Sequence, residues 1–98
     1  MSDPGNNENE NMQDENHEPA ANAQTLVTYL VKALVEDTDA VKVDVRDVGR
    51  KFVLDVRVGE GETGKVIGKQ GRTIKAIRTV ARAAAVRDNV QVDVDIDD

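Results

Sequence analysis

Three short stretches of the chain alternate apolar and polar side chains, and this alternation restricts the fold more than any other feature. Successive side chains of a β-strand point to opposite faces of a sheet. We therefore expect strands over 41–47 (VKVDVRD), 52–58 (FVLDVRV) and 90–96 (VQVDVDI). A sheet built from such strands has one covered face and one face in water, so all helices must share the covered face.

Two other segments carry helical periodicity. Residues 24–36 place Leu26, Leu30 and Leu34 at steps of four, and the apolar stripe is widened by Val27, Val31 and Ala33. The polar side of this segment offers one lysine, which favours packing on the sheet over lying on a membrane. A second helix is expected from about residue 72, after a short helical turn over 65–67. Its apolar arc is formed by Ile74, Ile77, Ala81, Ala84 and Ala85.

The order of these elements defines the fold class. It reads α-β-β-α-α-β, which predicts a two-layer α+β domain. Gly49 separates the first two strands, so they should form an antiparallel hairpin. Helices join the second strand to the third, so that pair should be parallel with a right-handed crossover. The expected architecture is a three-stranded mixed sheet covered by helices on one face.

The amino-terminal residues differ from the rest of the chain in composition. Residues 1–23 contain six acidic side chains, no lysine or arginine and few apolar groups, so ordering them would cost chain entropy with little to bury. We predict a disordered acidic tail over 1–23 and one domain over 24–98. The net charge of -6 belongs to the tail, because the remaining thirteen acidic residues equal the thirteen basic ones.

Several classes of function are disfavoured by what the chain lacks. It has no cysteine, and its only histidine, His17, and only serine, Ser2, fall in the predicted tail, so we expect no enzyme, metal site or cofactor. Tyr29 and Phe52 are the only aromatic residues, which disfavours binding by base stacking. The longest apolar run is too short to cross a bilayer, and we expect a cytoplasmic protein with no membrane contact.

Residues 64–87, GKVIGKQGRTIKAIRTVARAAAVR, hold seven of the thirteen basic residues and no carboxylate. Gly68 and Gly71 enclose Lys69 and Gln70 at the junction between the short helical turn and the second helix. Glycine permits positive φ and lets another backbone come close. The N-H groups and positive dipole end of the second helix suit a phosphate, to which Lys69 adds a charge and Gln70 a hydrogen bond.

The basic side chains continue from this loop along the second helix. A helical arc beside the apolar one carries a row of cations that no acidic residue interrupts in the sequence: Arg72, Lys75, Arg78 and Arg82, with Lys65 just before the loop. A solvated basic face is the alternative, but a row that starts at a glycine loop favours phosphate binding. The apolar walls of the groove beside it are expected from Val66, Ile67 and Ile74.

Two better-known phosphate-binding motifs do not match the sequence of this region. Three residues separate Gly64 from Gly68-Lys69 where a Walker loop has four, and Gln70 stands in place of its Ser or Thr. GEGETG, 59–64, matches the dinucleotide fingerprint, but Glu60 and Glu62 would repel a pyrophosphate and the domain has too few parallel strands.

VIGKQGRTIKAI, 66–77, resembles the signature of KH domains, VIG-x-x-G-x-x-I, whose GXXG loop clamps about four nucleotides. The element order resembles the type II arrangement of these domains. From about Leu26 to Ile96 the chain resembles the KhpA-type family of small bacterial proteins that consist of a single KH domain. By position, 68–71 would be the clamp, and Val66, Ile67 and Ile74 would contribute to the groove.

This resemblance implies binding of single-stranded RNA and a role as an RNA chaperone or post-transcriptional regulator. It also implies a homodimer, or a heterodimer with a KhpB-type KH protein, and a link to cell elongation and envelope homeostasis. Residues 1–23 and the glutamates of 59–64 depart from the usual family pattern. Two alternatives stay open: the domain serves as a protein-interaction adaptor with a vestigial nucleic-acid surface, and the acidic tail competes with RNA for the basic residues of 65–87.

Overall fold

The computed structural model describes residues 19–97, so the disorder predicted for the tail up to residue 18 lies outside the described residues. The elements follow the predicted order α-β-β-α-α-β, with two single-turn 3-10 helices, η2 and η3, added. Their bounds are α3 Ala21–Leu34, η2 Thr38–Ala40, β1 Lys42–Asp47, β2 Phe52–Arg57, α4 Thr63–Ile67, η3 Lys69–Gly71, α5 Arg72–Arg87 and β3 Val92–Ile96.

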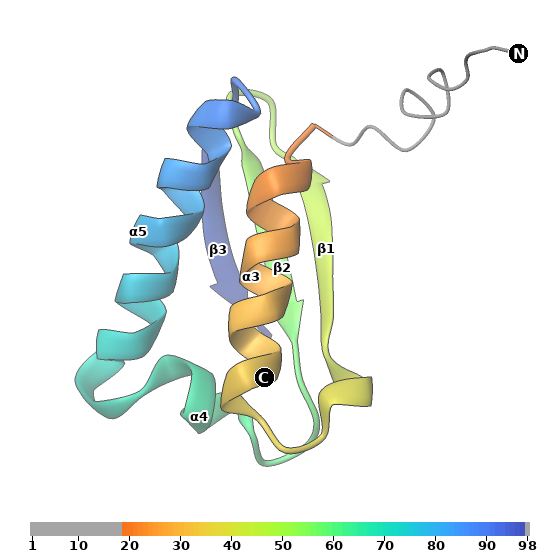
Figure 1. Cartoon of the computed structure of the whole chain (residues 1–98), viewed down its shortest axis with the longest axis vertical. Coiled ribbons are helices and arrows are strands. Elements are labelled where there is room, and N and C mark those ends of the chain that lie inside the picture. The colour runs from red at the N-terminus through yellow and green to blue at the C-terminus, as the bar shows by residue number, and fades with distance from the viewer. Residues whose placement is uncertain (1–18, 98) are drawn as a thin grey trace, which may run out of the picture.

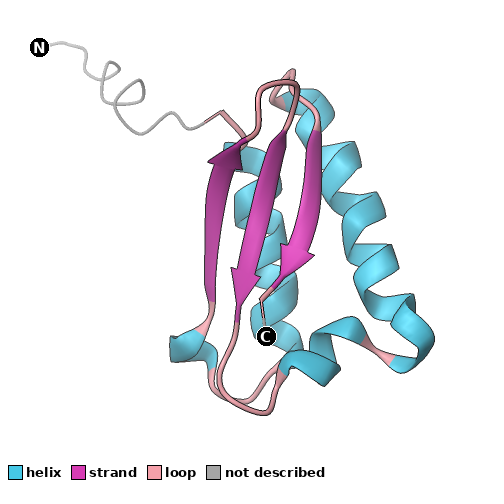
Figure 2. Ribbon diagram, turned by 180° about the vertical axis from the view of Figure 1, so that it is seen from behind, coloured by secondary structure: helices cyan, strands magenta, loops and turns pink. Residues whose placement is uncertain are grey.

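The three strands form one mixed sheet in the order β1-β2-β3 (Figure 2). β1 and β2 are antiparallel and β2 and β3 are parallel, which confirms both predicted pairings. Gly49 lies in the turn of the hairpin with a φ of 99°, a conformation open to glycine. α3 and α5 lie side by side on one face, and no helix formed by residues 19–97 covers the other face (Figures 1 and 2).

The core lies between the sheet and the two long helices, and small side chains dominate it. Leu54 is the largest fully buried side chain. Alanines on both helices bring their backbones close to the strands, so the two layers approach without bulky residues between them. The long helices and the strands contribute the following residues to the core: Ala23, Val27 and Val31 from α3, Ile74, Ile77, Ala81 and Ala85 from α5, and Val43, Leu54, Val56, Val92 and Val94 from the strands.

Within the apolar stripe predicted for α3, the valines are buried more deeply than the leucines. Leu26 and Leu30 are half-buried and Leu34 is 37% exposed, whereas Val27 and Val31 are fully buried. α3 contacts α5 as well as the sheet, so it has two neighbours rather than one. The short valines face the strands, where the approach is closest, and the longer leucines lie on the flank beside α5.

α3 begins at Ala21, three residues before the predicted start of the domain at residue 24. Its first N-H groups are capped by a residue that follows α5. The carboxylate of Asp88 accepts hydrogen bonds from the N-H of Asn22 at 3.1 Å and of Ala23 at 3.2 Å, and from the Asn22 side chain at 2.8 Å. This contact ties the start of α3 to the end of α5.

A buried glutamate fixes the opposite end of α3. Glu62, 8% exposed, accepts hydrogen bonds from the backbone N-H groups of Glu36 at 2.8 Å and Asp37 at 3.1 Å. The hydrogen bond from Asp37, then that from Glu36 and the charge of Lys65, hold the pKa of Glu62 below its usual value despite burial. Glu62 therefore joins the loop after α3 to the start of α4, which leads into the predicted clamp.

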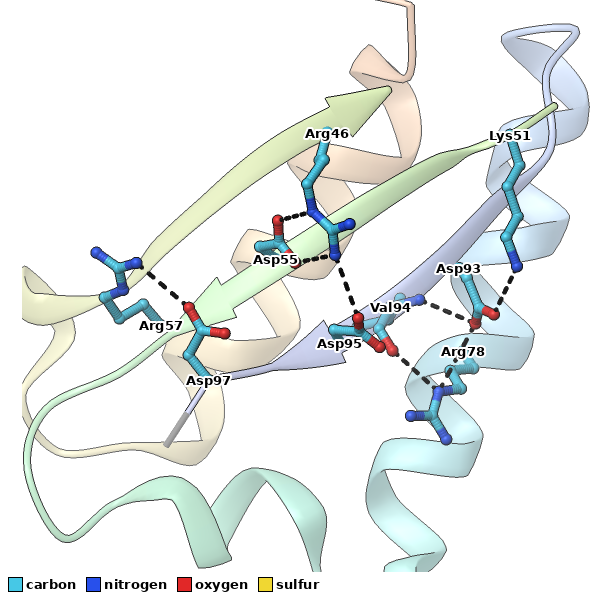
Figure 3. Close-up of polar contacts among 9 residues, drawn as sticks. All are labelled: Arg46, Lys51, Asp55, Arg57, Arg78, Asp93, Val94, Asp95 and Asp97. Atoms are coloured by element: carbon cyan, nitrogen blue, oxygen red, sulfur yellow. Dashed lines mark hydrogen bonds and ion pairs between the residues drawn. The ribbon is translucent and has the colours of Figure 1, made fainter. Parts of the chain in front are cut away.

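The open face of the sheet is covered by ion pairs between neighbouring strands (Figure 3). Arg46 of β1 binds Asp55 of β2 at 2.8 Å and reaches Asp95 of β3 at 3.3 Å. The hydrogen bond and charge of Arg46 hold the pKa of Asp55 below its usual range. Exposed pairs of this kind contribute little to stability, because solvent screens their charges.

Candidate nucleic-acid interface

Residues 68–71 form the corner between α4 and α5, at the opposite end of the molecule from the β1–β2 hairpin (Figure 1). Gly68 has φ 77° and ψ 175°, and Gly71 has φ 73° and ψ 14°. Gln70 between them is left-handed as well, at φ 59°. Both glycines thus adopt the positive φ that the sequence predicted, and the intervening Lys69 and Gln70 are exposed at the tip.

The structure explains why position 68 requires glycine in particular. A Cβ placed on Gly68 would lie 2.2 Å from Oγ1 of Thr73 and 3.0 Å from its backbone nitrogen. A Cβ on Gly71 would meet no atom within 4 Å. The close approach expected at this loop is therefore made by the first turn of α5 itself, which folds back against Gly68.

The start of α5 offers hydrogen-bond donors to an anion. Its N-cap is Gly71, and no side chain caps it within the described residues. The N-H groups of Gly71 and Arg72 donate to the carbonyls of Gly68 and Lys69, and the N-H groups that follow in the first turn of α5 lie at the positive end of the helix dipole. The corner thus presents backbone donors beside the exposed charges of Lys69 and Arg72.

The cations predicted to follow the loop fall into two groups. Lys69, Arg72 and Lys75 are exposed, and the structure gives them no ion pair within residues 19–97. Lys65 is also exposed, with Glu36 at 3.8 Å. The cationic surface nearest to the loop is therefore open to a ligand.

Further along α5 the predicted uninterrupted track was wrong, because a carboxylate from β3 reaches it. Asp93 lies 3.1 Å from Arg82. Arg78 lies 3.8 Å from the same carboxylate and Lys51 of the hairpin 3.3 Å from it (Figure 3). Sequence reasoning missed Asp93 and Lys51. Two sequence features could have predicted this contact. Arg78 and Arg82 are four residues apart, so they lie on one face of the helix, and that helix must pack beside the strand that carries Asp93.

Asp93 and Arg78 also close the outer edge of β3. The N-H of Val94 donates to Asp93 at 3.0 Å, and Nε of Arg78 donates to the carbonyl of Val94 at 3.1 Å. Burial alone would raise the pKa of Asp93, but the Val94 N-H, Lys51 and Arg82 together hold it below its usual value. The carboxylate is therefore ionised at neutral pH.

The apolar residues predicted to line the groove occupy different depths. Val66 is fully buried and Ile74 is 6% exposed, so both belong to the core beneath the loop. Ile67 is half-buried and lies at the surface between α4 and the corner. Their contribution to a groove stays a prediction, with Ile67 as the one of the three accessible to a ligand.

Other kinds of site find little support in the described part of the chain. Residues 19–97 contain no group of three histidine, cysteine or carboxylate side chains that could hold a metal ion. Across the same residues, every helix is too short or too polar to cross a bilayer.

Comparison with known proteins agrees with this geometry. The family model described as KhpA/KhpB, KH domain matches residues 24–96. The chain is 44% identical over 75 residues to the RNA-binding protein KhpA of Halalkalibacterium halodurans, which covers 76% of this chain and 99% of the relative. It is 45% identical over 71 residues to that of Clostridium acetobutylicum, covering 72% and 95% respectively. For Bacillus subtilis KhpA the identity is 41% over 75 residues, covering 76% and 93%.

A solved structure shares the fold at low sequence identity. A crystal structure of a variant of Era from Aquifex aeolicus superposes with a TM-score of 0.60 and 17% identity, covering 83% of this chain and 31% of that one. The chain thus corresponds to about a third of that larger protein.

Proposed function

Because the chain belongs to the KhpA/KhpB family of KH domains, we propose that it binds single-stranded RNA through the corner at 68–71. The observation that carries the proposal is the loop itself. Two glycines at positive φ expose Lys69 and Gln70 in front of an uncapped helix start, an arrangement suited to a phosphodiester backbone.

The proposed contact is small, which sets its expected strength. A GXXG loop clamps about four nucleotides, so few phosphates are engaged and a single site should bind weakly. Each phosphate contact adds about 0.7 to the slope of log affinity against log salt for a single strand. Useful affinity therefore calls for two domains acting on one RNA.

The double substitution Lys69→Asp with Gln70→Asp tests the loop. Aspartate tolerates the left-handed conformation of residue 70, and both glycines are kept, so the fold should persist. We expect loss of binding to a fluorescent single-stranded RNA in anisotropy titrations at low salt, with an unchanged circular-dichroism spectrum.

A matched control changes the net charge equally at another surface. Thr38→Asp with Lys42→Asp lowers the net charge by the same three units at two exposed positions, one in η2 and one at the start of the outer strand β1. Retained RNA binding in this control is expected. Equal loss in both variants would reduce the effect to overall charge and overturn the assignment to the loop.

The cellular role we propose follows the family: an RNA chaperone or post-transcriptional regulator in the cytoplasm, linked to cell elongation and envelope homeostasis. A strand-annealing assay with two complementary RNAs tests the chaperone activity. Acceleration by the wild-type chain but not by the Lys69→Asp, Gln70→Asp variant supports it, and equal rates contradict it.

A second surface favours association with another KH chain. An apolar groove between the outer sides of α3 and α5, here called the helical groove, has a volume of about 270 Å³. Leu34 at 37% and Val80 at 38% exposure lie on its walls. It is lined by Leu30, Ala33, Leu34, Thr73, Ala76, Ile77 and Val80. We propose it as the contact for a homodimer or for a heterodimer with a KhpB-type protein.

Val80→Lys tests this contact, because it places a charge in the helical groove. Sedimentation of the full chain should show a dimer that the substitution converts to monomer, while Val48→Lys, at an exposed hairpin position, leaves it intact. A wild-type chain that binds its partner through this groove but binds no single-stranded RNA would favour the adaptor function. A monomeric wild-type chain that binds no KhpB-type protein excludes both dimers.

A further inference from the structure

The carboxylates of the chain are divided unevenly between the domain and the residues before it. Residues 1–18, here called the acidic segment, carry six of the nineteen acidic residues and no lysine or arginine. The other thirteen acidic residues equal the thirteen basic ones in number. The KH domain of the family spans 24–96, so the six charges of the acidic segment are additional to that domain.

The cations of the corner are the ones on α5 that meet no carboxylate inside the domain. Lys69, Arg72 and Lys75 are exposed, and none of them forms an ion pair within residues 19–97. Arg72 donates a hydrogen bond of 3.4 Å to the side chain of Gln70, which carries no charge. The arginines further along α5 share the carboxylate of Asp93 instead. An anionic group that arrives at the corner therefore has no carboxylate of the domain to displace.

The acidic segment joins the domain beside the carboxyl end of α5. Asp88, directly after α5, accepts hydrogen bonds from the N-H groups of Asn22 at 3.1 Å and Ala23 at 3.2 Å. Figure 1 shows the start of α3 and the end of α5 side by side, with α4 and the corner at the opposite end. The acidic segment must therefore extend along the length of α5 to meet the corner.

The acidic residues of the segment differ in whether they can cover that length. α5 has 16 residues and is about 24 Å long. A chain spans at most about 3.6 Å per residue. Glu10, nine residues before Pro19, can thus lie up to about 32 Å from it, whereas Asp14, five residues before, reaches at most about 18 Å. The distal acids that can reach the corner are Asp3, Glu8 and Glu10, and the proximal acids that fall short of it are Asp14, Glu15 and Glu18.

We propose that the distal acids pair with Lys69, Arg72 and Lys75 when RNA is absent, and that they compete with RNA phosphates for these cations. This inference rests on the proposed function of the loop and adds its regulation. Single exposed ion pairs are weak. Attachment to the same chain nevertheless keeps the carboxylates near the corner at a high local concentration, so a few such pairs suffice against an RNA contact that is itself small.

Two full-length variants with equal changes in charge test the competition. The distal variant carries Asp3→Asn, Glu8→Gln and Glu10→Gln, and the proximal variant carries Asp14→Asn, Glu15→Gln and Glu18→Gln. In anisotropy titrations with single-stranded RNA at low salt, the distal variant should bind roughly three- to tenfold more tightly than the wild type. The proximal variant should stay within about twofold of it, and the gain of the distal variant should shrink as salt rises, because salt screens the pairs that it removes.

Equal gains in affinity for both variants would assign the effect to repulsion by net charge and overturn the competition. A readout without RNA reports the contact directly. The distal variant should shift the backbone amide resonances of residues 69–75 relative to the wild type, and the proximal variant should leave them in place. Resonances of 69–75 that are unchanged in the distal variant would overturn the contact between the acidic segment and the corner.

Failure of this inference can be told apart from failure of the proposed function. If Lys69→Asp with Gln70→Asp leaves RNA binding intact, the loop is not the clamp and the proposed function fails. If that variant abolishes RNA binding but the distal variant binds RNA no more tightly than the wild type, only the competition by the acidic segment is overturned.

Discussion

At the scale of single residues, the two glycines of the corner have different reasons to be glycine. Gly68 combines a positive φ with a side of the backbone that Thr73 fills, so both conformation and space exclude a side chain. Gly71 has the positive φ but open space around it. The sequence motif shows the same residue at both positions, and only the packing of α5 against Gly68 distinguishes them.

Gly68→Ala should therefore destabilise the domain more than Gly71→Ala. Strain at φ 77° and the clash with Thr73 together should cost about 3 kcal/mol or more, against about 1 kcal/mol for Gly71→Ala. Urea unfolding monitored by circular dichroism measures both. Equal losses of unfolding free energy in the two variants would show that Thr73 can move away from the added Cβ at little energetic cost.

At the scale of elements, long-range side-chain contacts fix the ends of the helices. α3 has no side-chain cap of its own, and Asp88, 66 positions after Asn22, supplies one. The carboxylate of Glu62 likewise accepts hydrogen bonds from backbone N-H groups of the loop that follows α3. The sequence does not distinguish these two residues from other acidic loop residues, because the backbone N-H groups that they bind are distant along the chain.

Asp88→Ala should lower the free energy of unfolding by about 1 kcal/mol, the usual effect of losing a helix cap. Asp44→Ala, at an exposed position of β1, is the control and should stay within about 0.5 kcal/mol of the wild type. A chemical denaturation series with both variants gives the comparison. If Asp88→Ala matched the control, the capping contact would be energetically neutral.

Glu62→Gln should destabilise the domain in a pH-dependent way. The pKa of Glu62 is lowered in the folded state, so the carboxylate contributes stability above its unfolded pKa of about 4.3 and loses it as pH falls through the folded value. The difference in unfolding free energy between wild type and variant should thus be present at about pH 7 and shrink towards about pH 3.

Glu60→Gln is the matched control, since Glu60 is exposed on the same loop. Its unfolding free energy should follow that of the wild type at both pH values. A Glu62→Gln difference that stayed constant with pH would mean that the ionisation of Glu62 does not stabilise the fold.

At the scale of the whole molecule, a small domain rests on a core of valine and alanine. A domain of this size buries only about 60% of its unfolded surface, so it has little stability to spare. Leu54 lies in the central strand beneath both long helices and has the largest fully buried side chain. The sheet's open face adds ion pairs rather than a second apolar layer.

Leu54→Ala should cost about 2–5 kcal/mol, a large part of the total for such a domain. Thermal unfolding should show a strongly lowered midpoint, while Val48→Ala, at a 44% exposed position, should change it little. RNA binding measured well below the lowered midpoint should be retained. Its loss under those conditions would mean that the corner at 68–71 depends on the core more tightly than its position suggests.

The local pattern of the sequence determined the element order, the antiparallel and parallel pairings and the glycine corner. Alternation and helical periodicity depend on neighbours within a few residues, and glycine marks a positive φ wherever it is required. The exposed start of the basic surface, Lys69, Arg72 and Lys75, follows from the same local reading.

Only the tertiary structure determined which side chains of these elements contact one another. It turned the leucines of α3 towards α5, buried Val66 and Ile74 beneath the corner, and brought Asp93 against Arg78 and Arg82. The physical reason is shared by all three: burial and ion pairing depend on contacts between elements. The distance and rotation between two packed elements depend on side chains of both, so neither segment specifies them by itself.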